Sequence, residues 1–450
     1  MRIDEEKLLL NWSEQINEQK IDGALYQKYN VMRGLRDLNG KGVLAGLTKV
    51  SDVHATYIDE NGNSVPCPGS LTYRGVNIKE IAQGLEQERR FGFEEVAYLL
   101  LFGKLPTRSE LRVFAELLSV YRQLPNDFIS DIIIRTPCKD MMNTLQRGIL
   151  TLYTYDEHAD DISTANVLRQ CLELIAKMPL IAVYGYQSYS HHFENKSLII
   201  HSPMDNLSTA ENLLRLLRAD SQYTQLEAKV LDLALILHAE HGGGNNSTFT
   251  NHVVSSSGTD TYSAMSASLG SLKGPRHGGA NIKVVRMFDD MKNVLDDTTS
   301  DAQVEGYLSA LLDKNAFDKA GLIYGFGHAV YSFSDPRAEV LKGYARRLSE
   351  EKGFSQDYEL YERVARLAPK VIGEKRKIYK GVCANVDFYS GLIYKMLNIP
   401  YELYTPIFAI ARIVGWSAHR IEELQDSKII RPAYKAVDTK TSYVGLDDRA

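Results

Sequence analysis

The spacing of apolar residues along the chain predicts a mainly helical protein. Residues 93–102 carry apolar side chains on almost every face of one helix, with a glycine and then a proline soon after it. This pattern predicts a buried helix that ends there. Residues 226–237 show a similar apolar surface all round, which predicts an interior helix. Its C-terminal end would deliver His238 and His241.

Signals for helix ends support two further helices. Ser208 with Glu211 three residues later is typical of a capping box. Near the C-terminus, Thr405 fits an N-cap with Pro406 at the first helical position. The core-facing stripe that follows consists of Ile407, Ile410, Ala411, Val414, Ala418 and Ile421. Arg412, Gly415, Trp416 and His419 fall on the other face.

Strand signals are sparse and gather near the start of the chain. Residues 50–58 and 69–73 flank a stretch that contains Asn61 and Gly62, a pair that favours a hairpin turn. The predicted fold class is therefore mainly α, with a minor β-hairpin near residues 50–73.

Length and charge narrow the class of protein. A chain of 450 residues exceeds what one hydrophobic core usually serves, so we expect two or more lobes with a cleft between them. The formal net charge of −5 gives no electrostatic reason to expect nucleic acid or an anionic membrane as a partner. The acidic first residues are unlike a secretory signal, and four scattered cysteines form no CxxC. We expect a cytoplasmic protein.

Three short polar clusters carry the candidate chemistry. They place His277, His328 and Asp387 among glycines and other small residues, where the backbone can approach a ligand closely. Two histidines and one carboxylate predict an acid/base site. Taken alone, each histidine also fits an ordinary loop histidine, and Asp387 fits the N-cap of a helix that follows.

A metal hydrolase is the alternative from another class of enzyme. His238 and His241 flank Glu240 at the end of a helix, and a short His-x-Glu also begins the zinc-deaminase signature. The cysteine ligands that complete that signature do not follow, and there is no HExxH sequence. We therefore predict no metal site.

Several motifs together, in order and spacing, resemble the citrate synthase family. They are His-Ala-Glu-His-Gly-Gly-Gly-Asn (238–245), Gly-Pro-Arg-His-Gly-Gly-Ala-Asn (274–281), Gly-Phe-Gly-His-Ala-Val-Tyr (325–331), Asp-Pro-Arg (335–337), Asn-Val-Asp-Phe-Tyr-Ser-Gly (385–391) and Ala-Arg-Ile-Val-Gly-Trp (411–416). The resemblance covers about residues 40–435. It implies a large helical domain (1–276 and 391–450), a small domain (277–390) and a homodimer.

The activity that the resemblance implies is condensation of acetyl-CoA with oxaloacetate and water to give citrate. Asp387 would be the base, His277 the partner of the thioester carbonyl, and His328 the group that polarises the keto oxygen of oxaloacetate. The residues that would bind oxaloacetate are His241, Arg337, Arg412 and Arg431, the last from the neighbouring subunit. A weakly acidic methyl group needs such a placed base and a donor for the developing oxyanion.

The same resemblance implies acetyl-CoA as a co-substrate and no tightly bound cofactor. The backbone of Leu322, Ile323, Tyr324, Gly325, Phe326 and Gly327 would meet the adenine. Many relatives have a basic residue between His328 and Asp335, whereas this chain has none. We expect the basic stretch Lys375-Arg376-Lys377 or Lys380 to take over part of the phosphate neutralisation, although such a run of charges also fits a solvated face.

Two alternatives to citrate synthesis stay open at this point. Within the family, 2-methylcitrate synthase uses propionyl-CoA, and one methylene in an apolar pocket changes binding by only about 1 to 3 kcal/mol. Outside enzymes, a helical binding protein with the same fold remains an alternative, because a fold does not guarantee activity.

Overall fold

The computed structural model describes residues 5–18, 20–37, 42–377, 381–425, 428–438 and 442–449. The chain divides into two units, residues 1–47 and 48–450. The first unit contains the helices α1 (Glu5–Glu18) and α2 (Gly23–Lys28) and the 3-10 turn η1 (Arg33–Leu35). Helix α2 begins after Asp22, whose side chain accepts a hydrogen bond from the Ala24 N–H. All candidate site residues belong to the second unit.

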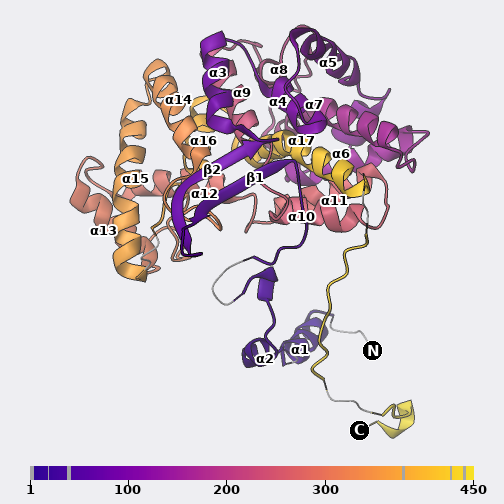
Figure 1. The fold of residues 1–450 in the computed structure, drawn as a ribbon, viewed down its shortest axis with the longest axis vertical. Coiled ribbons are helices and arrows are strands. Elements are labelled where there is room, and N and C mark those ends of the chain that lie inside the picture. Colours follow the sequence, from indigo (N-terminus) through magenta and orange to yellow (C-terminus); the bar gives the residue numbers. More distant parts are fainter. Residues whose placement is uncertain are drawn as a thin grey trace. The chain divides into compact units, whose positions relative to one another are not determined.

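The second unit begins with a small antiparallel sheet in the order β1-β2-β3 (Figure 1). Its strands are β1 (Ser51–Ile58), β2 (Ser64–Tyr73) and β3 (Val76–Asn77). In the turn between β1 and β2, the Asp59 carboxylate accepts from the N–H groups of Asn61 and Asn63, and Gly62 has a positive φ of 80°. The predicted hairpin is confirmed, although β2 starts earlier than the sequence indicated.

Helices make up most of the second unit, as predicted. They are α3 (Ile78–Glu88), α4 (Phe93–Phe102), α5 (Arg108–Tyr121), α6 (Met141–Leu152), α7 (Thr164–Glu194), α8 (Thr209–Leu217), α9 (Gln225–His238), α10 (Asn246–Ser255), α11 (Thr261–Lys273), α12 (Ala280–Val294), α13 (Asp301–Leu312), α14 (Pro336–Lys352), α15 (Ser355–Arg376), α16 (Val386–Met396) and α17 (Tyr404–Gln425). Short turns of other helix types are η2 (Ile129–Ile134), η3 (Tyr153–Tyr155), η4 (Tyr401–Leu403) and η5 (Leu446–Asp448). No helix in the described ranges is long and apolar enough to cross a bilayer.

The helices predicted over 93–102 and 226–237 are confirmed as α4 and α9. The capping box before α8 is also confirmed: the Ser208 hydroxyl accepts from the Glu211 N–H, and the Glu211 carboxylate accepts from the Ser208 N–H (2.9 Å). Each of these elements was marked by local signals, so sequence alone was enough to place it.

Helix α17 is buried on both of its faces from Tyr404 to Arg420. It contacts α4, α7, α9 and α10, which surround it in the core. The prediction of Thr405 as N-cap is wrong, because η4 runs directly into a helix that begins at Tyr404. The Thr405 hydroxyl instead donates to the Gly278 carbonyl (3.0 Å) and so ties α17 to the loop before α12.

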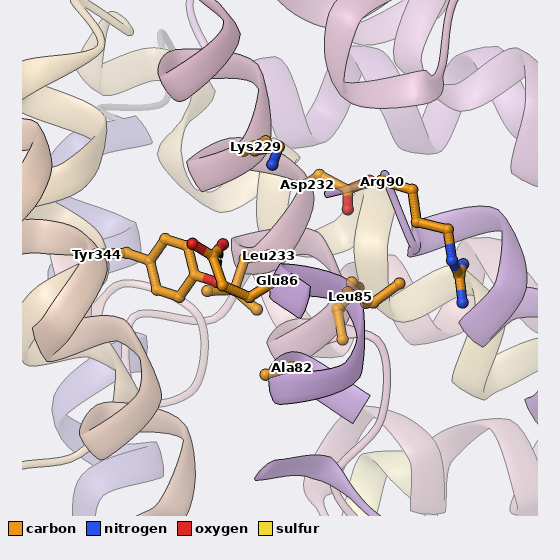
Figure 2. Close-up of a pocket in the computed structure, with 9 residues that line it drawn as sticks. Ala82, Leu85, Glu86, Arg90, Lys229, Asp232, Leu233 and Tyr344 are labelled. Atoms are coloured by element: carbon orange, nitrogen blue, oxygen red, sulfur yellow. Dashed lines mark hydrogen bonds between the residues drawn. The ribbon is translucent and has the colours of Figure 1, made fainter. Parts of the chain in front are cut away.

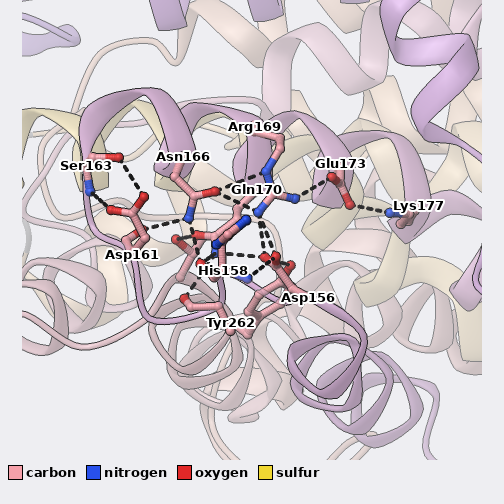
Figure 3. A network of polar contacts seen from close by, with 12 residues as sticks. Asp156, His158, Asp161, Ser163, Asn166, Arg169, Gln170, Glu173, Lys177 and Tyr262 are labelled. Carbon is pink, nitrogen blue, oxygen red and sulfur yellow. Dashed lines mark hydrogen bonds and ion pairs between the residues drawn. The ribbon is translucent and has the colours of Figure 1, made fainter.

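A polar network fastens the turn after η3 to α7 and α11 (Figure 3). The Asp156 carboxylate accepts hydrogen bonds from Arg169 (2.7 Å) and from the hydroxyl of Tyr262 (2.8 Å). Gln170 donates to the same carboxylate at 2.9 Å. Desolvation by burial acts to raise the pKa of Asp156, but these hydrogen bonds outweigh it and lower the pKa to about 2. The network therefore depends on an ionised carboxylate.

Candidate active site

His241 lies in a tight turn directly after α9. Within this turn the buried Glu240 carboxylate accepts from the Ser51 hydroxyl (2.9 Å) and from the Gly242 N–H. Gly242 has a φ of 83°, a left-handed conformation that favours glycine. The turn therefore fixes the backbone on both sides of His241 and joins it to the start of β1.

The His-x-Glu sequence that suggested a metal hydrolase is used for internal hydrogen bonding. The His238 Nδ1 lies 2.7 Å from the Ala234 carbonyl one turn earlier, and its ring meets Phe408 edge-on. Glu240 pairs with His419 at 3.0 Å, with both side chains fully buried. Among the described residues, no group of three or more His, Cys, Asp or Glu side chains is placed to hold a metal ion.

His277 lies in the loop between α11 and α12 and is held by Ser247 at the start of α10. Its Nε2 accepts a hydrogen bond from the Ser247 N–H (3.3 Å) and lies 2.9 Å from the Ser247 hydroxyl. Because a backbone N–H can only donate, neutral His277 carries its proton on Nδ1. Burial, helped by the charge of Arg412, lowers the pKa of His277 to about 4. The ring is therefore neutral at pH 7.

His328 is oriented by the backbone that follows it. Its Nδ1 accepts hydrogen bonds from the N–H groups of Val330 and Tyr331, each at 3.0 Å. Neutral His328 therefore carries its proton on Nε2, the opposite tautomer to that of His277. Its ring meets the His241 ring nearly at a right angle, with the ring centres 5.0 Å apart.

Asp387 lies in the first turn of α16, and it is not the N-cap of that helix. Asn385 is the cap, and its side chain accepts from the Asp387 N–H (3.1 Å). Asn385 also joins this helix to the segment before His328, because its N–H donates to the Gly325 carbonyl (2.9 Å) and its side chain to the Gly327 carbonyl (3.0 Å). Cross-linked in this way, the segments of His328 and Asp387 lie side by side.

The pKa of the Asp387 carboxyl is well above that of an ordinary aspartate. Desolvation raises its pKa to about 6, the nearby Asp335 carboxylate adds to the rise, and the charges of Arg337 and Arg412 oppose it. Among the described residues, no hydrogen bond holds the Asp387 carboxyl. A weakly held carboxylate with a raised pKa is a better proton acceptor than an ordinary aspartate.

Arg337 is buried at the start of α14 in a bidentate pair with Asp335. Its Nε and Nη2 lie 3.0 and 2.8 Å from the two carboxylate oxygens. One of these oxygens also accepts from the N–H of Val386 at the start of α16 (3.2 Å). Asp335 thus fixes Arg337 relative to the helix that carries Asp387.

Arg412 projects from the middle of α17 and is 1% exposed. Its Nε donates to the His238 carbonyl (2.8 Å), and its guanidinium lies over the Phe408 ring. No carboxylate among the described residues lies within ion-pair distance of Arg412. Desolvation lowers its pKa to about 10, so the side chain stays positively charged at neutral pH.

Six of the predicted residues form one cluster. Desolvation is the main cause of the pKa shifts of His241, His277 and Asp387, and the Arg412 charge lowers the pKa of all three. Arg337 acts in the same direction on His241 and Asp387. The cluster consists of His241, His277, His328, Arg337, Asp387 and Arg412.

Arg431 is not part of this cluster. It lies exposed in the extended segment after α17, and the neighbouring Ile430 N–H donates to the Ser256 hydroxyl (3.1 Å). Within the described part of the chain, Arg431 forms no hydrogen bond or ion pair with the six clustered residues.

The segment expected to meet CoA is partly accessible. Leu322 is exposed, whereas Ile323 and Gly325 are buried. The Tyr324 hydroxyl donates to Asp318 (2.6 Å), which also pairs with Lys283. Lys375, an expected phosphate contact, forms an exposed ion pair with Asp313, and Lys380 lies outside the described residues.

A separate cavity of about 20 Å³ lies between α3, α9 and α14 (Figure 2). Such a volume suits a single water molecule and is too small for a metabolite. Beside it, the Asp232 carboxylate accepts from the N–H groups of Gly92 and Phe93 at the start of α4. We therefore assign this cavity to the core and not to the active site.

Ser247 and Tyr331 are two contacts of the clustered histidines to which the sequence assigned no role. The Tyr331 hydroxyl lies 3.2 Å from the His241 Nε2, and its ring stacks on His328. Tyr331 belongs to the motif Gly-Phe-Gly-His-Ala-Val-Tyr (325–331) and follows His328 by three residues in a glycine-rich loop. That spacing was the available signal, but only the fold brings His241 beside it.

Comparisons with known proteins support the resemblance. The chain matches the family model "Citrate synthase, C-terminal domain" over residues 38–433. It is 34% identical over 415 residues to citrate synthase of Haloferax volcanii, covering 91% of this chain and 98% of that protein. It is 32% identical over 380 residues to 2-methylcitrate synthase of Shewanella oneidensis, covering 84% of this chain and 90% of that protein.

The fold is similar to that of a solved ternary complex of citrate synthase from Thermoplasma acidophilum with carboxymethyl coenzyme A and oxaloacetate. The TM-score is 0.74 at 28% sequence identity, covering 93% of this chain and 99% of that chain. Fold, length and sequence therefore agree. The chain belongs to the citrate synthase family.

Proposed function

We propose that the protein condenses acetyl-CoA with oxaloacetate and water to give citrate and free CoA. The observation that carries this proposal is the buried Arg412 guanidinium, which has no carboxylate partner among the described residues and whose charge lowers the pKa values of Asp387, His241 and His277. A buried cation is costly unless an anion pairs with it, and oxaloacetate offers two carboxylates. The Thermoplasma acidophilum relative was solved with oxaloacetate and a CoA derivative, which supports the same ligands here.

Enolisation of the acetyl group is the first chemical step. Asp387 removes a proton from the methyl carbon, and the electron pair of that C–H bond moves toward the thioester oxygen. His277 donates its Nδ1–H to this oxygen as negative charge develops there. The low pKa of His277 suits this role, because a neutral imidazole donates a hydrogen bond without being an acid at neutral pH.

Carbon–carbon bond formation is the second step. The enolate carbon attacks the keto carbon of oxaloacetate, whose oxygen gains negative charge and receives a hydrogen bond from the Nε2–H of His328. Protonation of this oxygen to the hydroxyl of the product balances the proton that Asp387 took from the methyl carbon. Arg337, Arg412 and His241 bind the carboxylates of oxaloacetate. The product of this step, citryl-CoA, is then hydrolysed at its thioester bond to citrate and CoA.

The complete site requires two subunits and two domains. In a homodimer, Arg431 reaches the oxaloacetate site across the subunit interface, which agrees with its exposure and its lack of contacts to the cluster. Residues 277–390 form a small domain whose closure excludes water before condensation. The backbone of residues 322–327 contacts the adenine of CoA.

The second candidate is 2-methylcitrate synthesis from propionyl-CoA. It is favoured by the nearly equal identity of the chain to a citrate synthase and to a 2-methylcitrate synthase, 34% and 32%. The test compares kcat/KM for acetyl-CoA and propionyl-CoA with oxaloacetate, by following thiol release. We expect acetyl-CoA to be preferred, and a preference for propionyl-CoA would select the second candidate. Asp387→Ala should abolish thiol release with either substrate.

A further inference from the structure

Tyr331 contacts two histidines of the cluster at once. Its side chain is 2% exposed, and its ring stacks on the His328 ring with a centre distance of 4.6 Å and an angle of 21°. Its hydroxyl lies 3.2 Å from the Nε2 of His241. The two histidines come from different segments, so Tyr331 is a shared support for both rings.

The β-hairpin fixes Tyr331 in turn. A Cβ at Gly69 would come within 2.5 Å of the Tyr331 ring and within 2.2 Å of the Ser334 carbonyl oxygen, so only glycine allows this approach. The Gly69 N–H donates to the Ser334 hydroxyl (3.3 Å). Strand β2 therefore holds the loop of residues 331–334 against its backbone, and Tyr331 cannot move without disturbing that strand.

The single proton of the Tyr331 hydroxyl has two acceptors within reach. One is the His241 Nε2 at 3.2 Å, and the other is the Ser70 carbonyl at 3.4 Å. Desolvation lowers the pKa of His241 well below its ordinary value and raises the pKa of Tyr331. At neutral pH the imidazole is therefore neutral and the phenol protonated. The shorter distance favours the hydrogen bond from the hydroxyl to the His241 Nε2 over the one to the Ser70 carbonyl.

We infer that Tyr331 is a positioning residue, whose hydroxyl holds His241 as the Nδ1–H tautomer and whose ring face holds the His328 imidazole in plane. A neutral histidine with its proton on Nδ1 offers that proton to an anionic oxygen, whereas the opposite tautomer would offer a lone pair there. The link to substrate rests on the proposed function, because the anion is a carboxylate of oxaloacetate. The arrangement of the His241 and His328 rings around Tyr331 does not depend on the proposed function.

The test separates the hydroxyl from the ring. Tyr331→Phe removes only the hydrogen bond to His241, and we expect KM for oxaloacetate to rise roughly three- to tenfold with kcat within about twofold of wild type. Tyr331→Leu also removes the stacked ring, and we expect kcat to fall by about tenfold in addition. Tyr344→Phe is the matched control. The Tyr344 hydroxyl donates to the Glu86 carboxylate (2.8 Å), and neither residue belongs to the cluster.

A second measurement, of the His241 tautomer, does not require enzymatic activity. Nitrogen-15 chemical shifts of the histidine side chains should show one Nδ1–H tautomer for His241 in the wild type and a mixture in Tyr331→Phe. An unchanged tautomer together with an unchanged KM would overturn the inference, as would equal losses in kcat for both Tyr331 variants. If the wild type turned over neither acyl-CoA, the proposed function would fail, and the chemical shifts would still decide the role of Tyr331.

Discussion

Ser247 contacts the same nitrogen of His277 twice, through its hydroxyl at 2.9 Å and through its backbone N–H at 3.3 Å. Substitution by alanine removes the hydroxyl contact to His277 and keeps the backbone contact, so the tautomer of His277 is kept while its ring is held less firmly. It also removes the hydroxyl's contacts with the Trp416 Nε1 (3.2 Å) and the Asn245 Oδ1 (3.1 Å). We expect Ser247→Ala to lower kcat roughly three- to tenfold, mainly through the lost neutral hydrogen bond to the His277 ring. Steady-state kinetics with saturating oxaloacetate measures this.

The control for this variant is Thr250→Ala on the same helix. The Thr250 hydroxyl donates only to the Asn246 carbonyl within α10, and its loss should leave kcat unchanged. Equal values of kcat for Ser247→Ala and the wild type would show that the hydroxyl does not support His277.

The pKa of Asp387 predicts the acid limb of the pH profile. A base must be deprotonated to act, and desolvation raises this pKa to about 6, so kcat/KM should fall tenfold for each pH unit below about 6. Asp387→Asn should lower kcat by at least about 10²-fold at every pH. Rates from pH 5 to 8 check both statements, and an acid limb near pH 4 would contradict the raised pKa.

Replacing Arg412 by lysine should damage oxaloacetate binding although the charge is kept. Lysine cannot reproduce the planar fork that binds a carboxylate through two parallel hydrogen bonds. It also has no Nε–H group to donate to the His238 carbonyl. We expect Arg412→Lys to weaken binding by roughly 10²-fold in calorimetric titration. Arg347→Lys, at an exposed pair with Glu86, is the control that should bind normally.

Asp156 should make the stability of the fold sensitive to acid. Its folded-state pKa of about 2 is depressed, so its contribution is complete above the unfolded value near 4 and is lost as the pH falls toward 2. We expect Asp156→Asn to lower Tm by about 2 to 4 °C at pH 7 and by less near pH 3. Calorimetry at both pH values measures the difference, with Asp160→Asn as a control in the same turn. A deficit that did not shrink in acid would argue against an ionised Asp156.

Local signals predicted the helices α4, α8, α9 and α17, and they failed where neighbouring elements decide the outcome. The pair Ser208 and Glu211 predicted a helix start correctly, because both partners of the capping box lie within one turn. Thr405 carried similar signals, yet η4 continues into α17 and moves its start to Tyr404. Likewise Asn385, two residues before Asp387, takes the capping position and leaves the carboxyl of Asp387 out of the cap.

The candidate residues were predictable by resemblance, whereas their supports were not. The partners Ser247 and His277 lie 30 residues apart, and His241 and Tyr331 lie 90 residues apart. Such pairs exist only once the helices are packed, so no periodicity or short motif encodes them. The burial of Arg412 was equally hidden, because one face of α17 looked polar in sequence and the fold covers that face as well.

Asn385 forms a backbone hydrogen bond to Gly325 and a side-chain hydrogen bond to Gly327. These two bonds link the start of α16 rigidly to the loop before His328. A thermal displacement of α16 therefore also displaces the loop before His328. The spacing between the Asp387 carboxylate and the His328 imidazole is preserved under such motion. Their alignment with Ser247 on α10, with His277 in the loop before α12 and with Arg412 on α17 can vary, so that alignment is where fluctuations would modulate turnover.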